Sequence, residues 1–357
     1  MELDFAEVLM QVMEQGASDL HLTAGAPPML RKRGQLSPLD YPAMTPQVVR
    51  EIVYSILTND QRQRLETDWQ IDLAYSIPGR ARFRVNAFFQ RDSLGAAFRL
   101  IPSEMPALDT LGLPPVIRDL TRKPRGFVLV TGPTGSGKST TLAAMIDVIN
   151  QSRHEHIMTV EDPIEFLHRH KSCIVNQREI GSDAQSFAMA LKAALRQDPD
   201  VILVGEMRDL ETISTALTAA ETGHLVFATL HTQDTAQTVD RIVDVFPPTQ
   251  QQQVRVQLSV ALQGIVTQQL LPTADGMGRV AATEILIPTP AVRNLVREGK
   301  THQIYSTLQT GASHGMQTMD AALADLVRRD KITRELAEAR SSSPEELRRL
   351  MGTVKAA

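Results

Sequence analysis

Cysteine is almost missing from this sequence, since Cys173 is the only one among 357 residues. A single thiol forms neither an intramolecular disulfide nor a zinc site of four cysteines, which excludes both kinds of cross-link. An isolated cysteine usually packs as a small apolar side chain. We therefore expect Cys173 to lie buried in the core.

A positive net charge is missing as well, and aromatic residues are scarce. The formal net charge is −4, and aromatic residues make up 4% of the chain. A motor that moves along nucleic acid is expected to carry a basic channel and aromatic or lysine-rich loops. A local basic surface remains compatible with this average charge. We nevertheless expect no nucleic-acid partner.

Long apolar runs are absent as well. The longest, at 127–130 and 201–204, are far shorter than the roughly 20 residues that span a bilayer. The chain starts with MELDF, which is acidic and lacks the basic-then-apolar plan of a secretory signal. These features predict a cytoplasmic protein.

The first hundred residues have the pattern of a small α+β domain, which we place at 1–101. The expected elements are helices at 5–13 and 52–65 and strands at 19–23, 71–77, 82–89 and 95–101, with a Pro78-Gly79 turn before the strand at 82–89. Residues 102–124 contain five prolines and are expected to form a stiff linker with one short helix.

From residue 125 to 357 the pattern changes to an α/β domain. Apolar strands are expected at 127–131, 157–160, 201–204 and 225–229. They alternate with helical stretches, which is typical of a mainly parallel sheet covered on both faces. Ser182 and Gln185 resemble a capping box that opens the helix containing Phe187 and Leu191.

A phosphate-binding loop stands between the first of these strands and a helix. Residues 132–139, GPTGSGKS, fit the pattern G-x-x-x-x-G-K-[ST] without a gap. Glycines let successive backbone N–H groups point inward at phosphate oxygens, and the helix N-terminus favours negative charge. Lys138 is expected to reach the β- and γ-phosphates of ATP, and the Ser139 hydroxyl to hold Mg²⁺.

Acidic residues follow two more of the expected strands. The segment DVILVGEMRD delivers Glu206 at a carboxyl end, where open α/β sheets bind ligands. Gly205 stands where many ATPases carry aspartate. The segment IMTVEDPIEF places Glu161 and Asp162 at another strand end. Phosphoryl transfer needs one group to orient water and one to help hold the metal, and these carboxylates are the candidates.

A histidine stands on each side of the strand in GHLVFATLHT. His224 and His231 are separated by an odd number of residues, so along a regular strand they face opposite ways and are poor ligands for one metal ion. For each histidine two roles remain open: a sensor of the γ-phosphate, or an ordinary hydrogen-bonded side chain.

The order of these segments resembles Walker A, Asp box, Walker B and His box of the secretion-ATPase superfamily, whose members are hexameric RecA-like motors. Further segments are similar to the retraction-ATPase family of type IV pili: ASDLHLTAGAPP at 17–28, RFRVNAFFQ at 82–90, AVRNLVREGK at 291–300 and GMQTMD at 315–320. The resemblance covers nearly the whole chain. It implies a RecA-like ATPase domain preceded by a small PAS-like α+β domain.

The resemblance also implies roles for individual residues. Nucleotide would be bound by Gly132, Pro133, Thr134, Gly135, Ser136, Gly137, Lys138, Ser139 and Thr140. Glu161 would help activate the attacking water, and Glu206 would act near Mg²⁺ and the γ-phosphate, although the identity of the base stays open. Arg84 and Arg99 match arginines that the small domain offers to nucleotide across a subunit or domain boundary. His224 and His231 would sense nucleotide.

The partners come from the resemblance too. It implies a homohexamer at the cytoplasmic face of the inner membrane, a platform protein of the pilus machine and a paralogous retraction ATPase as partners, and retraction that depends on the helix at 291–298. Pilus-assembly and type II secretion ATPases are alternatives, but they usually have a larger N-terminal region and a four-cysteine module. An accessory retraction ATPase, a nucleic-acid-translocating RecA-like motor and a nucleotide-binding scaffold without turnover are further alternatives.

Overall fold

The computed structural model describes residues 4–32, 34–77, 80–101 and 105–352. The chain divides into two compact units, which are residues 1–104 with 165–167 and residues 105–164 with 168–357. We call them the first and the second unit and describe each by itself. The expected Pro78-Gly79 turn, residues 1–3 of the acidic start and residues 102–104 of the expected linker lie outside the described residues.

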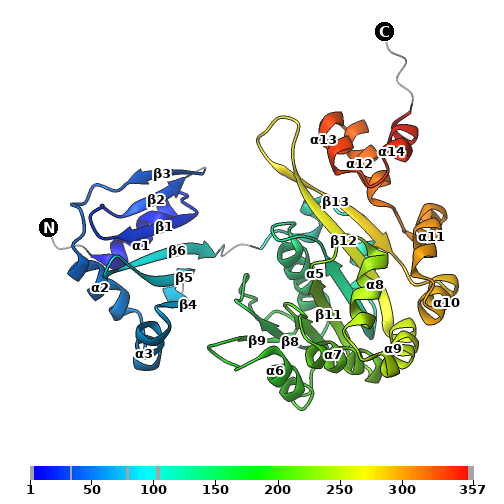
Figure 1. Cartoon of the computed structure of the whole chain (residues 1–357), viewed down its shortest axis with the longest axis horizontal. Helices are drawn as coiled ribbons and strands as arrows, with labels where there is room; N and C mark the ends of the chain where they lie inside the picture. The colour runs from blue at the N-terminus through cyan, green and yellow to red at the C-terminus, as the bar shows by residue number, and fades with distance from the viewer. Residues whose placement is uncertain (1–3, 33, 78–79, 102–104, 353–357) are drawn as a thin grey trace, which may run out of the picture. The chain divides into compact units, whose positions relative to one another are not determined.

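The first unit contains a six-stranded antiparallel sheet in the order β3-β2-β1-β6-β5-β4. Its elements, drawn from blue to cyan in Figure 1, are α1 (Phe5–Glu14), β1 (Asp19–Thr23), β2 (Met29–Lys32), β3 (Gln35–Pro38), α2 (Pro46–Ser55), α3 (Asn59–Asp68), β4 (Gln70–Ile77), β5 (Ala81–Gln90) and β6 (Ser93–Ile101). The expected α+β character is confirmed.

The single helix expected over 52–65 is two helices, α2 and α3. Thr58 breaks the run because its hydroxyl accepts a hydrogen bond from the Gln61 backbone, while the Gln61 side chain accepts one from the Thr58 backbone. This capping box starts a new helix and competes with continuation of the old one.

One face of the first unit's sheet carries its core. Leu20, Phe83 and Phe98 come from three different strands and are fully buried. They belong to one cluster with Val8 and Val49 of the helices α1 and α2. The opposite face of the same strands carries the polar residues that concern function.

The second unit contains a seven-stranded sheet in the order β13-β12-β7-β11-β10-β8-β9, parallel except for β13. Its strands are β7 (Gly126–Thr131), β8 (His156–Glu161), β9 (Ile174–Glu179), β10 (Val201–Val204), β11 (Leu225–Leu230), β12 (Leu262–Pro272) and β13 (Arg279–Leu286). Its helices are η1 (Leu108–Leu111), α4 (Val116–Leu120), α5 (Lys138–Ser152), α6 (Phe187–Ala194), α7 (Leu210–Thr222), α8 (Thr235–Asp244), α9 (Pro248–Ala261), α10 (Pro290–Glu298), η2 (Thr301–Gln303), α11 (Ile304–Thr310), η3 (Ala312–His314), α12 (Met319–Arg328), α13 (Arg334–Arg340) and α14 (Pro344–Met351).

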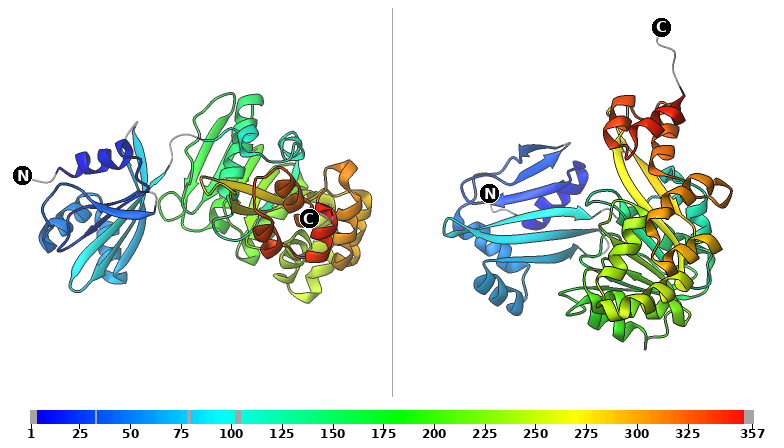
Figure 2. Two further views of the ribbon diagram at one scale, coloured as in Figure 1. Left: turned by 90° about the horizontal axis from the view of Figure 1, so that it is seen from above. Right: turned by 45° about the vertical axis from the view of Figure 1, so that its right-hand side comes forward.

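Helices cover both faces of this sheet, as the continuous apolar strands predict. Every residue of β7 is buried. Phe127 and Leu129 pack in the cluster that contains residues of α7, α8 and α9, while Val128 and Val130 pack in the cluster that contains α5. The helices α12, α13 and α14 gather beside the β12–β13 hairpin, where Leu271 and Ala282 share a cluster with them (Figure 2).

The expected linker differs from what the structure shows. Residues 105–124 form η1 and α4, and their side chains Leu108, Ile117 and Leu120 are buried in the same cluster as α5. They are therefore part of the second unit. The prolines limit the length of the helices in this segment. The short helices η1 and α4 still pack their apolar side chains into the core of the second unit.

Three smaller expectations have different outcomes. Cys173 is 2% exposed, which confirms a buried thiol. The helix α6 begins after Ser186, whose hydroxyl accepts from Met189 N, so the capping box expected at Ser182 is wrong by one turn. Within the part of the chain that the structure describes, no helix has the length and apolar character needed to cross a bilayer.

Candidate nucleotide-binding site

The phosphate loop connects the carboxyl end of β7 to the first turn of α5. Gly132 and Gly137 have positive φ values of 136° and 87°. A Cβ atom on Gly132 would lie 2.2 Å from the backbone oxygen of Gln268 on the neighbouring strand β12. Glycine is therefore required at this position both by conformation and by lack of space.

Lys138 is the buried cation of this loop. Its side chain is 9% exposed, and Nζ donates hydrogen bonds to the backbone oxygens of Gly132 at 2.9 Å and Pro133 at 3.0 Å. Burial lowers the pKa of Lys138, and the nearby charge of Glu206 partly opposes that shift. The carbonyls hold the ammonium group inside the curve of the loop.

The polar groups of the loop fit a phosphate chain. Among the described residues, the buried hydroxyl of Ser136 has no hydrogen-bond partner. A buried polar group without a partner is costly, and phosphate oxygens supply acceptors for such a donor. Ser139, in contrast, is exposed at the start of α5. Its hydroxyl is accessible to a metal ion, as Mg²⁺ requires in loops of this type.

Glu206 lies just beyond β10 and is contacted by Arg208 and His231. Arg208 donates two hydrogen bonds to its carboxylate, at 2.6 and 2.7 Å, and His231 Nε2 lies 3.0 Å from Oε1. Burial acts to raise the pKa of Glu206, but the Arg208 hydrogen bond and the His231 charge lower it below its ordinary value. Glu206 therefore stays ionised, which a metal-binding carboxylate requires.

Glu161 ends the neighbouring strand β8 and is 9% exposed. Its Oε1 accepts hydrogen bonds from Thr159 Oγ1 at 2.6 Å and from Gln177 Nε2 at 3.1 Å. These two donors fix the direction of the carboxylate. Because β8 and β10 are adjacent and parallel, Glu161 and Glu206 share the carboxyl edge of the sheet.

The structure explains why glycine replaces aspartate at position 205. A Cβ atom there would lie 3.2 Å from the Glu161 Cα and 3.2 Å from the Val160 oxygen. An aspartate would push the two strand ends apart. The Thr229 hydroxyl of β11 donates to the Gly205 oxygen and ties the third strand to the same place.

The two histidines lie at opposite ends of β11. His231 follows the strand and contacts Glu206 at the carboxyl edge of the sheet, so the expected sensor role remains a prediction for this residue. His224 precedes the strand, and its Nδ1 lies 3.0 Å from the Ala219 oxygen of α7. The expected sensor role of His224 does not fit this position, because the amino ends of parallel strands lie at the edge away from the loop.

Arg84 and Arg99 belong to the first unit and face each other directly across β5 and β6. Both are exposed, and Arg99 Nε donates to Asp19 Oδ1 at 2.9 Å. Burial acts to raise the pKa of Asp19, but hydrogen bonds from Ser18 and Arg99 lower it overall. Like charges at directly opposed strand positions cost about 0.2–1 kcal/mol. Such a pair suits a site that receives an anion.

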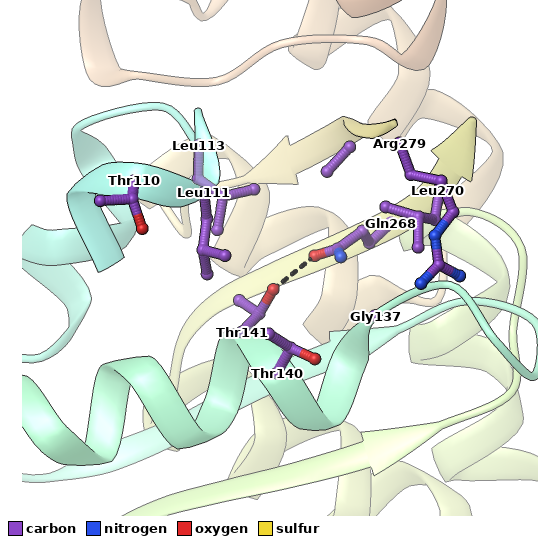
Figure 3. A pocket seen from close by; sticks show the side chains of 10 residues that line it. Thr110, Leu111, Leu113, Gly137, Thr140, Thr141, Gln268, Leu270 and Arg279 are labelled. Carbon is purple, nitrogen blue, oxygen red and sulfur yellow. Dashed lines mark hydrogen bonds between the residues drawn. The ribbon is translucent and has the colours of Figure 1, made fainter. Parts of the chain in front are cut away.

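A cavity of about 360 Å³ adjoins the phosphate loop (Figure 3). One wall carries Leu111 and Leu113, the opposite wall Leu270 and Arg279, and Thr140 of α5 lies on its floor. A cavity lined by both apolar and polar side chains beside a phosphate loop fits a nucleotide base. No sequence pattern pointed to Leu111 and Leu113, because leucines in a proline-rich stretch have no chemical signature.

The helix α10 contains the AVRNLVRE segment. Val292 and Val296 are fully buried, so they form the packing face of this helix. Arg293 is half-buried on the same helix. Its Nη1 donates to the backbone oxygens of Ser259 and Val260 at the end of α9, which caps that helix.

Replacing Gly132 with alanine is expected to destabilise the protein by about 3 kcal/mol and to weaken ADP binding. Gly135→Ala is the matched control, since Gly135 also has positive φ, 81°, but its Cβ would meet nothing within 4 Å. We expect about 1 kcal/mol there. Chemical unfolding and titration with a fluorescent ADP analogue measure both, and equal losses in the two variants would contradict the crowding at Gly132.

The sequence matches the family of type II/IV secretion system proteins over residues 2–351. The type IV pilus retraction ATPase PilT of Pseudomonas aeruginosa is 53% identical over 343 residues, which cover 96% of this chain and 99% of that protein. A twitching motility protein of Neisseria gonorrhoeae is 53% identical over 320 residues, which cover 90% of this chain and 86% of that protein. The solved structure of the pilus retraction motor PilT with bound ADP matches with a TM-score of 0.92 and 53% identity, and covers 98% of this chain and 100% of that one.

Proposed function

Since this chain belongs to the family of type II/IV secretion system proteins, we propose that it is the ATP-hydrolysing motor that retracts type IV pili. The observation that carries this function is the 53% identity to a pilus retraction ATPase over 96% of this chain. The phosphate loop at 132–139, with Glu161 and Glu206 at neighbouring strand ends, supplies the chemistry that such a motor needs.

The chain's own groups bind and orient the triphosphate. Backbone N–H groups of the loop and the N-terminus of α5 face the phosphates, and Lys138 exchanges its carbonyl partners for the β- and γ-phosphate oxygens. The base lies in the cavity lined by Leu111, Leu113 and Leu270. Ser139 and Glu206 would hold Mg²⁺, which would neutralise part of the phosphate charge.

We assign the attacking water to Glu161. Its carboxylate is fixed by Thr159 and Gln177, which is the preorganisation that a general base needs. Glu206 is held by cations that keep its pKa low, and a carboxylate of low pKa is a better metal ligand than a base. His231, in contact with Glu206, is positioned to sense the γ-phosphate.

The arginines of the first unit complete the motor. We propose that Arg84 and Arg99 neutralise phosphate charge when the first unit of this or a neighbouring subunit closes on the nucleotide. Hydrolysis and release weaken those contacts. ATP and ADP then bind with different affinities to the closed arrangement of the first unit on the nucleotide. Such a difference in affinity is required if the nucleotide is to drive a conformational change.

The assembly follows from the same family. We propose a homohexamer at the cytoplasmic face of the inner membrane, held there by a platform protein of the pilus machine and working with a paralogous retraction ATPase. The helix α10 is the segment that we assign to retraction, because it lies within AVRNLVREGK, one of the segments that resemble the retraction-ATPase family.

Deleting the gene is expected to leave cells heavily piliated and unable to twitch. Pilus number by electron microscopy and colony spreading on a surface measure the two traits, and the unaltered gene supplied in trans is the control. Loss of pili would favour the alternative of a pilus-assembly ATPase. Normal twitching would contradict both.

A further inference from the structure

Gln268 is a buried side chain that joins the phosphate loop to the sheet. Gln268 lies on β12 and is 2% exposed. The preceding residue on this strand, Thr267, pairs with Thr131 of β7. Its Nε2 donates to the Ser136 backbone oxygen at 2.7 Å, and its Oε1 accepts from Thr141 Oγ1 at 2.9 Å. Figure 3 shows the second of these bonds.

The two bonds span the junction between loop and helix. Ser136 is among the last loop residues, Thr141 lies in the first turn of α5, and Lys138 stands between them. The backbone groups that face phosphate are therefore held from both sides by one side chain. The same strand crowds the loop further, because a Cβ atom on Gly137 would lie 2.7 Å from Gln268 Nε2.

The chemistry of this position selects an amide. The loop presents a carbonyl, which needs a donor, and a hydroxyl that donates, which needs an acceptor. A glutamine has both at the tip of an uncharged side chain, whereas ionised glutamate only accepts and lysine only donates. Losing either bond would leave a buried polar group without its partner.

We propose that Gln268 is a positioning residue that holds the phosphate loop in the shape that binds nucleotide before nucleotide arrives. Without it the loop samples other shapes, and the apparent affinity falls by the fraction of molecules that remain competent. This inference rests on the proposed function and adds to it a residue that touches the loop from another strand.

The test compares Gln268→Met with Gln269→Met. The second variant is the matched control, because residue 269 is the next on β12, half-buried, and directed to the other face of the strand. Binding of Mg-ADP is followed with a fluorescent ADP analogue, and ATP hydrolysis gives KM and kcat. Gln268→Met is expected to weaken ADP binding and raise KM by about 10- to 30-fold, as the loss of two hydrogen bonds implies.

The split between KM and kcat separates positioning from general damage. Bound nucleotide orders the loop itself, so kcat is expected to fall by less than about threefold. Gln269→Met should leave both constants within about twofold. If Gln268→Met also leaves Kd and KM within about twofold of the unaltered chain, the inference is overturned.

A second pair of variants keeps the test decisive if Gln268→Met does not fold. Thr141→Val removes the hydroxyl at nearly constant volume and should weaken ADP binding by about three- to tenfold, while Thr141→Ser retains the bond and should restore it. Equal affinities in these two variants overturn the inference.

If the unaltered chain bound no Mg-ADP, both the proposed function and this inference would fail. If Lys138→Ala loses ADP and Gln268→Met does not, the role of Gln268 alone is wrong.

Discussion

Lys138→Ala is expected to abolish Mg-ATP hydrolysis, with a loss of about 10³-fold or more, and to leave the fold intact. The ammonium group is held inside the loop by the Gly132 and Pro133 carbonyls, where bound phosphates would meet it directly. Alanine is a good first residue for α5, and the glycines rather than the lysine set the loop's shape. Phosphate release and far-ultraviolet circular dichroism measure the two properties.

The control for this variant is Lys192→Ala, which removes an exposed lysine that pairs with Glu211 on the surface. Exposed ion pairs contribute little, so its rate should stay within about twofold of the unaltered chain. Turnover at the unaltered rate in folded Lys138→Ala would refute the assignment of the site.

Glu161→Gln is expected to lower the hydrolysis rate by about 10²- to 10⁴-fold while ATP binding stays within about threefold. The amide has the size of the carboxylate and keeps an oxygen for Thr159, but it cannot take a proton from water. Single-turnover hydrolysis and equilibrium binding of a non-hydrolysable ATP analogue measure the two effects.

Glu206→Gln is the informative comparison for the two glutamates. If Glu206 holds the metal, this variant loses affinity for ATP in the presence of Mg²⁺ and not in the presence of a chelator. The roles are reversed if Glu161→Gln hydrolyses ATP normally and Glu206→Gln binds Mg-ATP normally without turning it over.

Local chemistry in the sequence was enough to point to the centre of the candidate site. The loop at 132–139 is contiguous, so its glycines, lysine and serine can be recognised as a phosphate-binding motif from the sequence alone. Glu161 and Glu206 were predictable because parallel strands bring their carboxyl ends to one edge. The histidines show the limit of that rule: the spacing of His224 and His231 correctly separated them, and only the direction of β11 shows that His224 lies at the wrong edge.

The rest of the site depends on contacts between segments far apart in the chain. Gln268 reaches the loop across 132 residues of sequence, and no local pattern distinguishes it from Gln269. Leu111 and Leu113 stood in a stretch expected to be a linker, because proline content predicts stiffness but not where a short helix packs. The direct opposition of Arg84 and Arg99 depends on strand register, which the turn between the strands determines.

The retraction of single pili, measured with optical tweezers in cells whose only copy of this chain carries Glu161→Gln, tests the central claim most directly. If hydrolysis at the loop around Lys138 drives the motor, these cells assemble pili that never retract, and the unaltered gene restores retraction. Retraction at the normal speed with a chain that no longer hydrolyses ATP would contradict the account.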